Sequence, residues 1–124
     1  MNIHAHYCDN IIRHANDQYS LIGIYSNVYP LPTAQHTIGQ LNINIEIEAN
    51  EALFQQPLRI SIELNQQPIL QGDMPTPPIQ TGISLVQPQL NNLPVHTGDK
   101  LTVRLYRAEQ TIWQSQPLVF KQAA

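Results

Sequence analysis

The feature that most constrains the fold is a stretch in which apolar and polar side chains alternate without a break. From Leu41 to Glu48, each odd-numbered residue is aliphatic and each even-numbered residue is polar. Successive side chains of a β-strand point to opposite faces of the sheet, so this stretch predicts a strand with one face in a core and the other in water. Leu58–Leu64 repeats the pattern with several β-branched residues, which favour a strand over a helix. Because a short segment ending at Pro57 separates the two stretches, we expect them to return on each other like a hairpin.

Less regular period-two patterns cover most of the remaining chain. We expect strands near Ile3–Tyr7, Tyr19–Tyr25, Pro68–Gly72, Ile83–Gln87 and Leu101–Leu105, and a last strand that ends at Phe120. Residues Tyr19–Tyr25 are apolar on both faces, which predicts a central or covered strand. Gly23 within them predicts a bulge or a close backbone approach. The prolines between Met74 and Pro94 exclude a helix in that segment and favour an edge strand near Ile83.

Size and periodicity together set the expected architecture. At 124 residues the chain is near the commonest size for one domain, and no linker divides it. No 3.6-residue amphipathic period extends over a useful length, so helices should be minor. We therefore predict a single all-β domain over residues 1–124. It should be an immunoglobulin-like antiparallel β-sandwich of about seven to eight strands with little or no helix.

The charge balance excludes some classes of partner. Charged residues make up only 12% of the chain, the formal net charge is −3, and the six basic residues are scattered. Phosphate backbones need clustered Lys and Arg, so we expect no nucleic-acid partner. The single cysteine excludes an internal disulfide. The first residues lack the regions of a signal peptide, and no apolar run nears the ~20 residues that span a bilayer. We therefore expect a cytoplasmic protein without membrane contact.

Two short motifs follow each other near the N-terminus. Tyr7-Cys8-Asp9-Asn10 precedes a polar turn, and Leu21-Ile22-Gly23-Ile24-Tyr25 follows it. This order resembles the start of a family of small bacterial β-sandwich proteins of unknown function, the DUF6941 type. Asn10 stands where that family often has a second acid, and the middle of this chain does not align with it. The resemblance implies an immunoglobulin-like or related sandwich and supplies no catalytic residues.

A metal site is one candidate function. On a strand, His4, His6 and Cys8 would share one face, and imidazole and thiolate are good zinc or copper ligands. Asp9 or His14 could complete the shell. Neighbouring same-face residues lie ~7 Å apart along a strand, however, which is long for sharing one ion. The competing interpretation, which we favour, is a solvent-facing side of the first strand.

Catalytic motifs are absent from the sequence. We find no Gly-x-Ser-x-Gly, no phosphate-binding loop and no dinucleotide fingerprint. A nucleophilic Cys8 would need a base within hydrogen-bond reach, and nothing in the sequence places a histidine there. We therefore predict that the chain is not an enzyme and has no cofactor.

Aromatic side chains give the better functional indication. Tyr25 and Tyr29 lie close together in the sequence, and period two places Trp113 opposite a core face formed with Ile112. Exposed Tyr and Trp are typical anchors of protein interfaces. The alternative for Trp113 is a bulge that rotates its side chain into the core. Strands that lack charged gatekeepers also favour edge-to-edge pairing with a partner.

The leading hypothesis is a non-enzymatic protein-interaction module. It could self-associate as a homodimer, or act as an inhibitor or accessory factor, such as a phage or mobile-element protein that blocks a host complex. One alternative is a metal- or small-ligand-binding protein that uses His4, His6 and Cys8. Another is a carbohydrate-binding sandwich that uses Tyr25, Tyr29 or Trp113, by analogy of fold alone.

Overall fold

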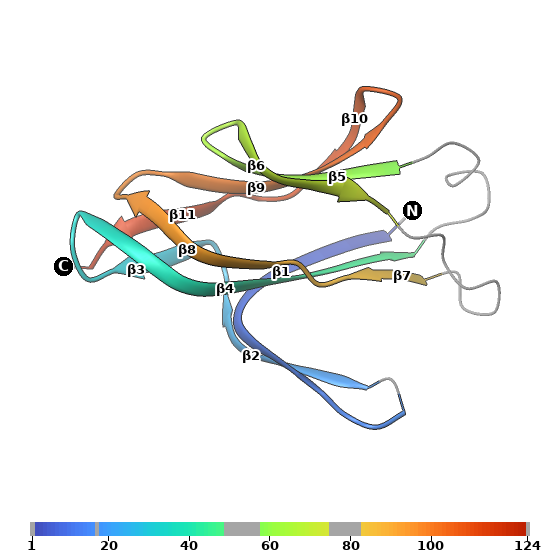
Figure 1. The fold of residues 1–124 in the computed structure, drawn as a ribbon, viewed down its shortest axis with the longest axis horizontal. Coiled ribbons are helices and arrows are strands. Elements are labelled where there is room, and N and C mark those ends of the chain that lie inside the picture. Colours follow the sequence, from blue (N-terminus) through green and yellow to red (C-terminus); the bar gives the residue numbers. More distant parts are fainter. Residues whose placement is uncertain (1, 17, 49–57, 75–82, 124) are drawn as a thin grey trace.

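The protein folds as two packed β-sheets in a computed structural model that describes residues 2–16, 18–48, 58–74 and 83–123 (Figure 1). Within these ranges there are eleven strands and no helix, so the all-β prediction is confirmed, although the predicted seven to eight strands were too few. The strands are β1 (Asn2–Arg13), β2 (Tyr19–Tyr25), β3 (Val28–Leu31), β4 (Gln35–Glu48), β5 (Leu58–Leu64), β6 (Gln67–Asp73), β7 (Ile83–Val86), β8 (Gln89–His96), β9 (Lys100–Arg107), β10 (Gln110–Gln114) and β11 (Leu118–Gln122). No helix in the described part of the chain is long and apolar enough to cross a membrane.

Each strand belongs to one of two sheets. The first has the order β2-β1-β4-β7. Strand β8 belongs to the same sheet: β7 and β8 pair with two successive parts of one edge of β4. The second has the order β3-β11-β9-β5-β6, with β10 paired to β9. Almost all pairs are antiparallel, but β3 and β11 run parallel, which ties an early strand to the last one. Strand pairing therefore joins parts of the chain that are far apart in the sequence.

The core lies between the inner faces of the two sheets. In β4, all the odd-numbered aliphatic residues of the alternating stretch are buried, as their pattern predicted. Strand β9 faces them with its own odd-numbered residues, and β11 adds Phe120, which is fully buried. The buried apolar residues that form this core are Tyr7, Leu31, Ile38, Leu41, Ile43, Ile45, Ile47, Leu58, Ile60, Ile62, Leu90, Leu93, Val95, Leu101, Val103, Leu105, Leu118 and Phe120.

The predicted hairpin of the two alternating stretches is wrong. Strand β4 pairs with β1, β7 and β8, whereas β5 pairs with β6 and β9 in the other sheet. The segment that joins them, residues 49–57, lies outside the described residues. Alternation fixes which face of a strand is apolar, and that face can be covered by an opposing sheet as well as by a neighbour. The two stretches face each other across the core instead of pairing side by side.

The polar faces of these strands are also less exposed than predicted. On the outer face of β4, Asn42 and Asn44 are both buried, and on β5 so are Ser61 and Glu63. The Asn42 Nδ2 donates to the backbone oxygen of Asp9 at 2.8 Å. Polar side chains can be buried when each finds a hydrogen-bond partner within the protein. The alternating sequence pattern does not reveal these partners.

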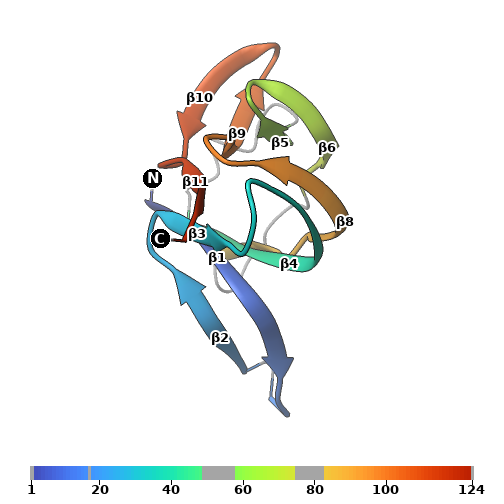
Figure 2. The same cartoon turned by 90° about the vertical axis from the view of Figure 1, so that its left-hand side faces the viewer.

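Strand β2 departs furthest from its prediction. Its apolar character on both faces predicted a central strand, yet β2 is an edge strand that forms a hairpin with the second half of β1. Figures 1 and 2 show this hairpin projecting from the body of the sandwich. The close approach predicted at Gly23 is present: its φ is +70°, and a Cβ there would collide with the Asp9 side chain. The projecting hairpin leaves apolar side chains of β2 exposed.

The proline-rich segment contains more strand than predicted. The expected edge strand near Ile83 is present as β7, while residues 75–82 lie outside the described part of the chain. No strand was predicted where β8 lies; it contains Pro94 and follows Pro88. Proline is tolerated in β8 because this strand lies at the edge of its sheet. The chain turns after Leu64 and after Arg107 in two tight hairpins, with positive φ at their two central residues.

Candidate binding groove

A groove of about 330 Å³ brings together several of the residues singled out from the sequence. One wall is the N-terminal half of β1, and the other is formed by β10 and the segment that follows it. The end of β2 closes the groove at one side, and in Figure 2 these elements lie on the side of the molecule where the N-terminus is marked. The residues that line it are Ile3, His4, Ala5, His6, Tyr7, Ile24, Tyr25, Ser26, Trp113, Ser115 and Gln116.

The wall formed by β1 is the edge of a strand and not its face. Five consecutive residues, Ile3 to Tyr7, line the groove. Because side chains alternate between faces, a wall made by one face would contain only every second residue. In the described chain β2 pairs with β1 only from Tyr7 onward, since β2 ends at Tyr25 and the chain then crosses to β3 in the other sheet. Along the groove, no described strand therefore pairs with this edge of β1 before Tyr7.

Trp113 reaches the groove because of an irregularity in its strand. The register of β10 against β9 shifts between Thr111 and Trp113, as a β-bulge does. Both Ile112 and Trp113 are therefore half-buried and pack against the core. The shift in register is the irregularity that the alternative for Trp113 required, and it leaves this side chain half-buried. The indole is partly covered by the core and partly accessible from the groove.

Tyr25 is supported by a stack of aromatic rings. Its ring lies 4.6 Å from that of Tyr29, centroid to centroid, and Tyr29 lies 5.5 Å from the ring of Phe120. The Tyr25 hydroxyl donates to a carboxylate oxygen of Asp9. Tyr29 does not line the groove. Of the three aromatic residues predicted for an interface, Tyr25 and Trp113 thus line the same groove. Tyr29 lies outside the lining and packs against the ring of Tyr25.

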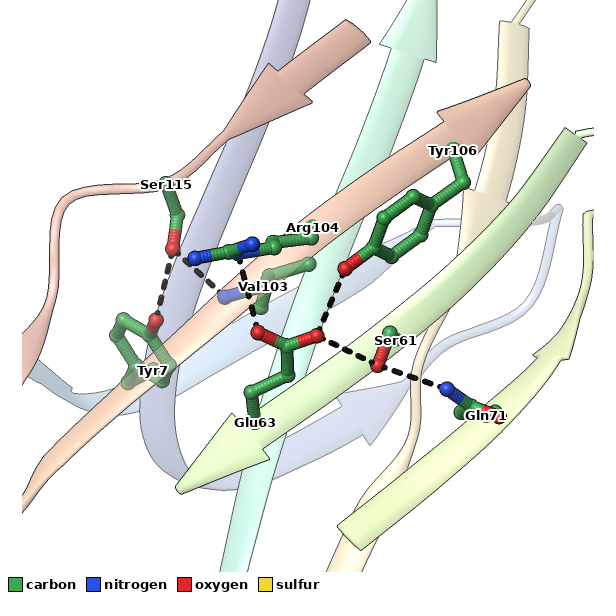
Figure 3. Close-up of polar contacts among 8 residues, drawn as sticks. All are labelled: Tyr7, Ser61, Glu63, Gln71, Val103, Arg104, Tyr106 and Ser115. Atoms are coloured by element: carbon green, nitrogen blue, oxygen red, sulfur yellow. Dashed lines mark hydrogen bonds and ion pairs between the residues drawn. The ribbon is translucent and has the colours of Figure 1, made fainter. Parts of the chain in front are cut away.

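Beneath the groove, Tyr7 is fixed by hydrogen bonds that Figure 3 shows in part. Its hydroxyl donates to the Leu101 carbonyl oxygen at 3.2 Å and shares a hydrogen bond of 3.0 Å with Ser115. The Ser115 oxygen in turn accepts the backbone N–H of Val103 at 2.9 Å. These bonds join β1 to the other sheet at the floor of the groove. None of the described residues that line the groove is Asp, Glu, Lys or Arg, so this lining suits an uncharged ligand.

The tyrosine environment gives a pH-dependent prediction. Burial, and next the hydrogen bond to Asp9, raise the pKa of Tyr25 well above its ordinary value. The folded state then holds the phenol proton more tightly than the unfolded state, which releases it near pH ~10. The stabilisation is complete below that pH and is lost as the pH rises toward the folded pKa. We expect the free energy of unfolding to fall above pH ~10, and to fall less in Tyr25→Phe, as measured by urea denaturation at pH ~9 and pH ~11.

Tyr7 and Tyr19, whose pKa values are also raised by burial, remain in both proteins and cancel in that comparison. An identical alkaline loss in the wild type and in Tyr25→Phe would contradict the prediction.

The residues of the metal hypothesis do not form a common exposed face. His4 and His6 are exposed and line the groove, whereas Cys8 is completely buried. Burial, and next the charge of Asp9, raise the pKa of the Cys8 thiol, which disfavours the thiolate that binds metals. Among the described residues, no three His, Cys, Asp or Glu side chains gather closely enough to hold an ion. The metal site stays a prediction that the geometry does not favour.

A second polar cluster lies on the outer face of the other sheet (Figure 3). The Glu63 carboxylate is buried; it lies 3.0 Å from the Arg104 Nε and accepts the Tyr106 hydroxyl at 2.9 Å. The Ser61 hydroxyl donates to the same carboxylate at 3.2 Å and accepts from the Gln71 amide at 3.4 Å. These contacts join β5, β6 and β9. The Glu63 Oε2 accepts both hydrogen bonds, whereas Oε1 has the ion pair with the Arg104 Nε and no hydrogen bond among the described residues. The cluster therefore ties three strands together.

Sequence reasoning found the side chains of the groove but not its edge. Ser115 and Gln116 follow a short strand and carried no distinguishing pattern, and the open edge of β1 depends on where β2 leaves it. The available signal for this edge in the sequence was an N-terminal strand without charged residues next to an aromatic residue. Comparison of the chain with protein-family models, curated proteins and solved structures found no match.

Proposed function

We propose that the chain is a non-enzymatic protein-interaction module that binds an extended, uncharged peptide segment in the groove. The observation that carries the proposal is the open edge of β1 lining a groove that also contains Tyr25 and Trp113. A peptide would add to the sheet as a strand beside Ile3–His6, which β2 leaves unpaired, and continue the line of β2. Its backbone would pair with that of β1, and an apolar side chain would contact the indole of Trp113.

Strand addition divides affinity and specificity between backbone and side chains. Main-chain hydrogen bonds supply affinity to any extended segment, and pockets for alternate side chains select the sequence. At ~3.4 Å per residue, the four lining residues that β2 leaves unpaired, Ile3–His6, accommodate a segment of about 14 Å. Trp and Tyr are enriched among residues whose truncation costs the most binding energy. The absence of charge in the lining favours ligands without Lys, Arg, Asp or Glu at the central positions.

Carbohydrate binding is the main competing function for the same groove. Tyr25 and Trp113, with Ser26 and Gln116 beside them, could offer stacking surfaces and hydrogen bonds to a sugar. Such a ligand would have no use for the backbone of β1. Four consecutive residues of the unpaired edge in the lining therefore support a peptide over a sugar.

Other features belong to the same proposal. A role as an inhibitor or accessory factor, for instance one encoded by a phage, is one form that peptide binding could take. We also propose a cytoplasmic location, a relation to the DUF6941-type proteins, and an immunoglobulin-like arrangement of the strands. The two-sheet packing supports the last of these.

The proposal is tested by selecting ligands from a library of random decapeptides displayed on phage. We expect uncharged sequences rich in β-branched and aromatic residues, with micromolar affinity in fluorescence polarisation. Trp113→Ala should weaken their binding at least about tenfold, because an interface anchor is lost. Ile69→Ala, on the exposed surface of β6, is the matched control and should bind as the wild type does.

Backbone pairing is tested on the ligand, which leaves the fold of the protein untouched. Methylation of alternate peptide nitrogens removes the N–H groups that pair with β1 and should abolish binding in one of the two registers. Equal affinity of both methylated peptides would exclude strand addition. Recovery of glycans from a glycan array, with no peptides from the library, would replace the proposal with carbohydrate binding.

A further inference from the structure

A second pocket, of about 420 Å³, lies on the outer face of the sheet that contains β9. Three of its lining residues, Lys100, Thr102 and Arg104, are alternate residues of β9. Alternate side chains of a strand point to one face, and the intervening Leu101 and Val103 are buried in the core. The three side chains therefore project in a row away from the core. The other lining residues are Asn65, Gln66, Gln114 and Pro117.

This pocket is distinct from the binding groove. The segment around the end of β10 contributes to both, but with different residues. Ser115 and Gln116 line the groove, whereas Gln114 and Pro117 line the pocket. The two linings have no described residue in common, so a ligand of the pocket would leave the groove accessible.

The lining gathers positive charge in a chain that is acidic as a whole. The chain has six Lys and Arg residues and a formal net charge of −3, and two of the six, Lys100 and Arg104, line this pocket. None of the described lining residues is Asp or Glu. Within the described ranges, no carboxylate forms an ion pair with the Lys100 side chain. The pocket therefore offers a cation without a partner, and its charge is complementary to an anion.

Arg104 is held by a carboxylate that lies outside the lining. Glu63 is only 5% exposed, and its Oε1 lies 3.0 Å from the Arg104 Nε (Figure 3). The hydroxyls of Tyr106 and Ser61 share the charge of this carboxylate. The terminal nitrogens of Arg104 have no hydrogen bond with a described residue, and the side chain is 26% exposed. A guanidinium held at Nε can still present its two terminal nitrogens to two oxygens of an anion.

The acidic residue next to Lys100 in the sequence is also engaged. The Asp99 carboxylate accepts the Asn65 side-chain amide at 2.9 Å and the backbone N–H of His96 at 2.8 Å, one on each oxygen. The Asn65 side-chain oxygen accepts the backbone N–H of Lys100 at 3.0 Å. These bonds shape the turn before β9 without using the Lys100 ammonium.

Uncharged donors complete the lining. The Thr102 hydroxyl lies between the two cations along β9, and the amides of Gln66 and Gln114 come from the turn before β6 and from β10. None of these three side chains has a hydrogen bond with another residue of the described chain. Donors from three elements suit an anion whose oxygens point in several directions. A phosphate group has three strong acceptor oxygens, whereas a carboxylate has two in one plane.

We propose that this pocket binds the phosphate group of a small phosphomonoester. Lys100 supplies a point charge, Arg104 supplies paired donors, and Thr102 donates to an oxygen between them. The volume of about 420 Å³ is about fourteen times the ~30 Å³ of one water, so an organic group fits beside the phosphate, and Pro117 offers it an apolar surface. Two cations are too few for a nucleic-acid backbone. This inference does not depend on peptide binding in the groove.

The test is a titration of the full chain with inorganic phosphate and with glycerol phosphate, followed by amide NMR spectra at low salt. Both should shift the backbone amide resonances of Lys100–Arg104 saturably. We expect a dissociation constant of about 1 mM for inorganic phosphate, because the site is open to water and has two cations. Glycerol should leave these resonances unchanged, and acetate should bind at least about fivefold more weakly than phosphate.

A pair of lysine variants locates the site. Lys100→Met should weaken the binding of inorganic phosphate at least about fivefold, because a charge-assisted contact is lost. Lys121→Met makes the same change of charge at an exposed position of β11 outside the lining, and should bind phosphate as the wild type does. Arg104 is left unchanged, because its loss would leave Glu63 without its cation. Circular dichroism verifies that both variants are folded.

Three results would overturn the proposal. The first is the absence of saturable shifts up to about 20 mM phosphate, far above the expected dissociation constant. The second is an equal loss of affinity in Lys100→Met and Lys121→Met, which would show attraction to net charge alone. The third is acetate binding as tightly as phosphate. Folded Lys100→Met should still bind the selected peptides, which separates this proposal from that of the groove.

Discussion

Replacing Arg104 by methionine should lower the free energy of unfolding by about 3 kcal/mol, at the lower end of the range for broken buried ion pairs. The substitution leaves the Glu63 carboxylate without its cation, while only 5% of that side chain is exposed. Hydrogen bonds from Tyr106 and Ser61 remain, but they cannot neutralise the charge. The Arg104 side chain is 26% exposed, so water can reach part of the site and limits the loss.

A double variant identifies the cause of this loss. Arg104→Met combined with Glu63→Gln removes both charges, and it should recover at least half of the lost free energy, because an uncharged amide tolerates burial better. The control is Lys100→Met, which removes a positive charge from an exposed position on the same face of β9 and should change stability by less than about 0.5 kcal/mol. Urea denaturation gives the free energy of unfolding of the wild type and of these three variants. A loss below about 1 kcal/mol in Arg104→Met would show that the pair contributes little.

The sequence predicted secondary structure better than it predicted pairing. The inner faces of β4 and β5 follow from the alternation of apolar and polar residues. Pairing partners do not follow, because an apolar face can be covered by a neighbour in the sheet or by the opposite sheet. For β4 and β5 the opposite sheet is the answer, and the expected hairpin was therefore wrong.

The same limit explains the two errors that matter most for function. Tyr19–Tyr25 was predicted to be central because both of its faces are apolar, yet Ile22 and Ile24 are exposed. Another molecule can bury the second apolar face of a strand, and the sequence of a single chain does not show such a partner. Trp113 was assigned to an outer face by counting in twos, and a bulge of one residue reverses such a count.

Aromatic composition identified Tyr25 and Trp113 as candidates, and the groove brings them together. The open edge of β1 could not be predicted, because it results from the point at which β2 crosses to the other sheet. Edges are properties of long-range topology, whereas side-chain types are properties of the sequence. Site prediction from sequence therefore found the anchors and missed the surface that they flank.

Phe120 connects the stability of the core to the shape of the groove. Its side chain is fully buried, and its ring supports Tyr29, which in turn supports Tyr25. Phe120→Ala should lower the free energy of unfolding by about 3–5 kcal/mol, because it removes a large side chain and leaves a cavity between the sheets. Val119→Ala, at the neighbouring half-buried position of β11, is the control and should cost about 1 kcal/mol.

Binding measurements on a milder variant extend this prediction to function. Phe120→Leu keeps an apolar side chain in the core and should remain folded, but it removes the ring on which Tyr29 packs. The Tyr25 ring would then lose its fixed position, and the affinity for selected peptides should fall severalfold although no groove residue has changed. Val119 is not one of the three aromatic residues that pack together, so Val119→Ala should retain full affinity. Unchanged peptide binding by folded Phe120→Leu would mean that the position of Tyr25 depends on its hydrogen bond to Asp9 and not on the stack.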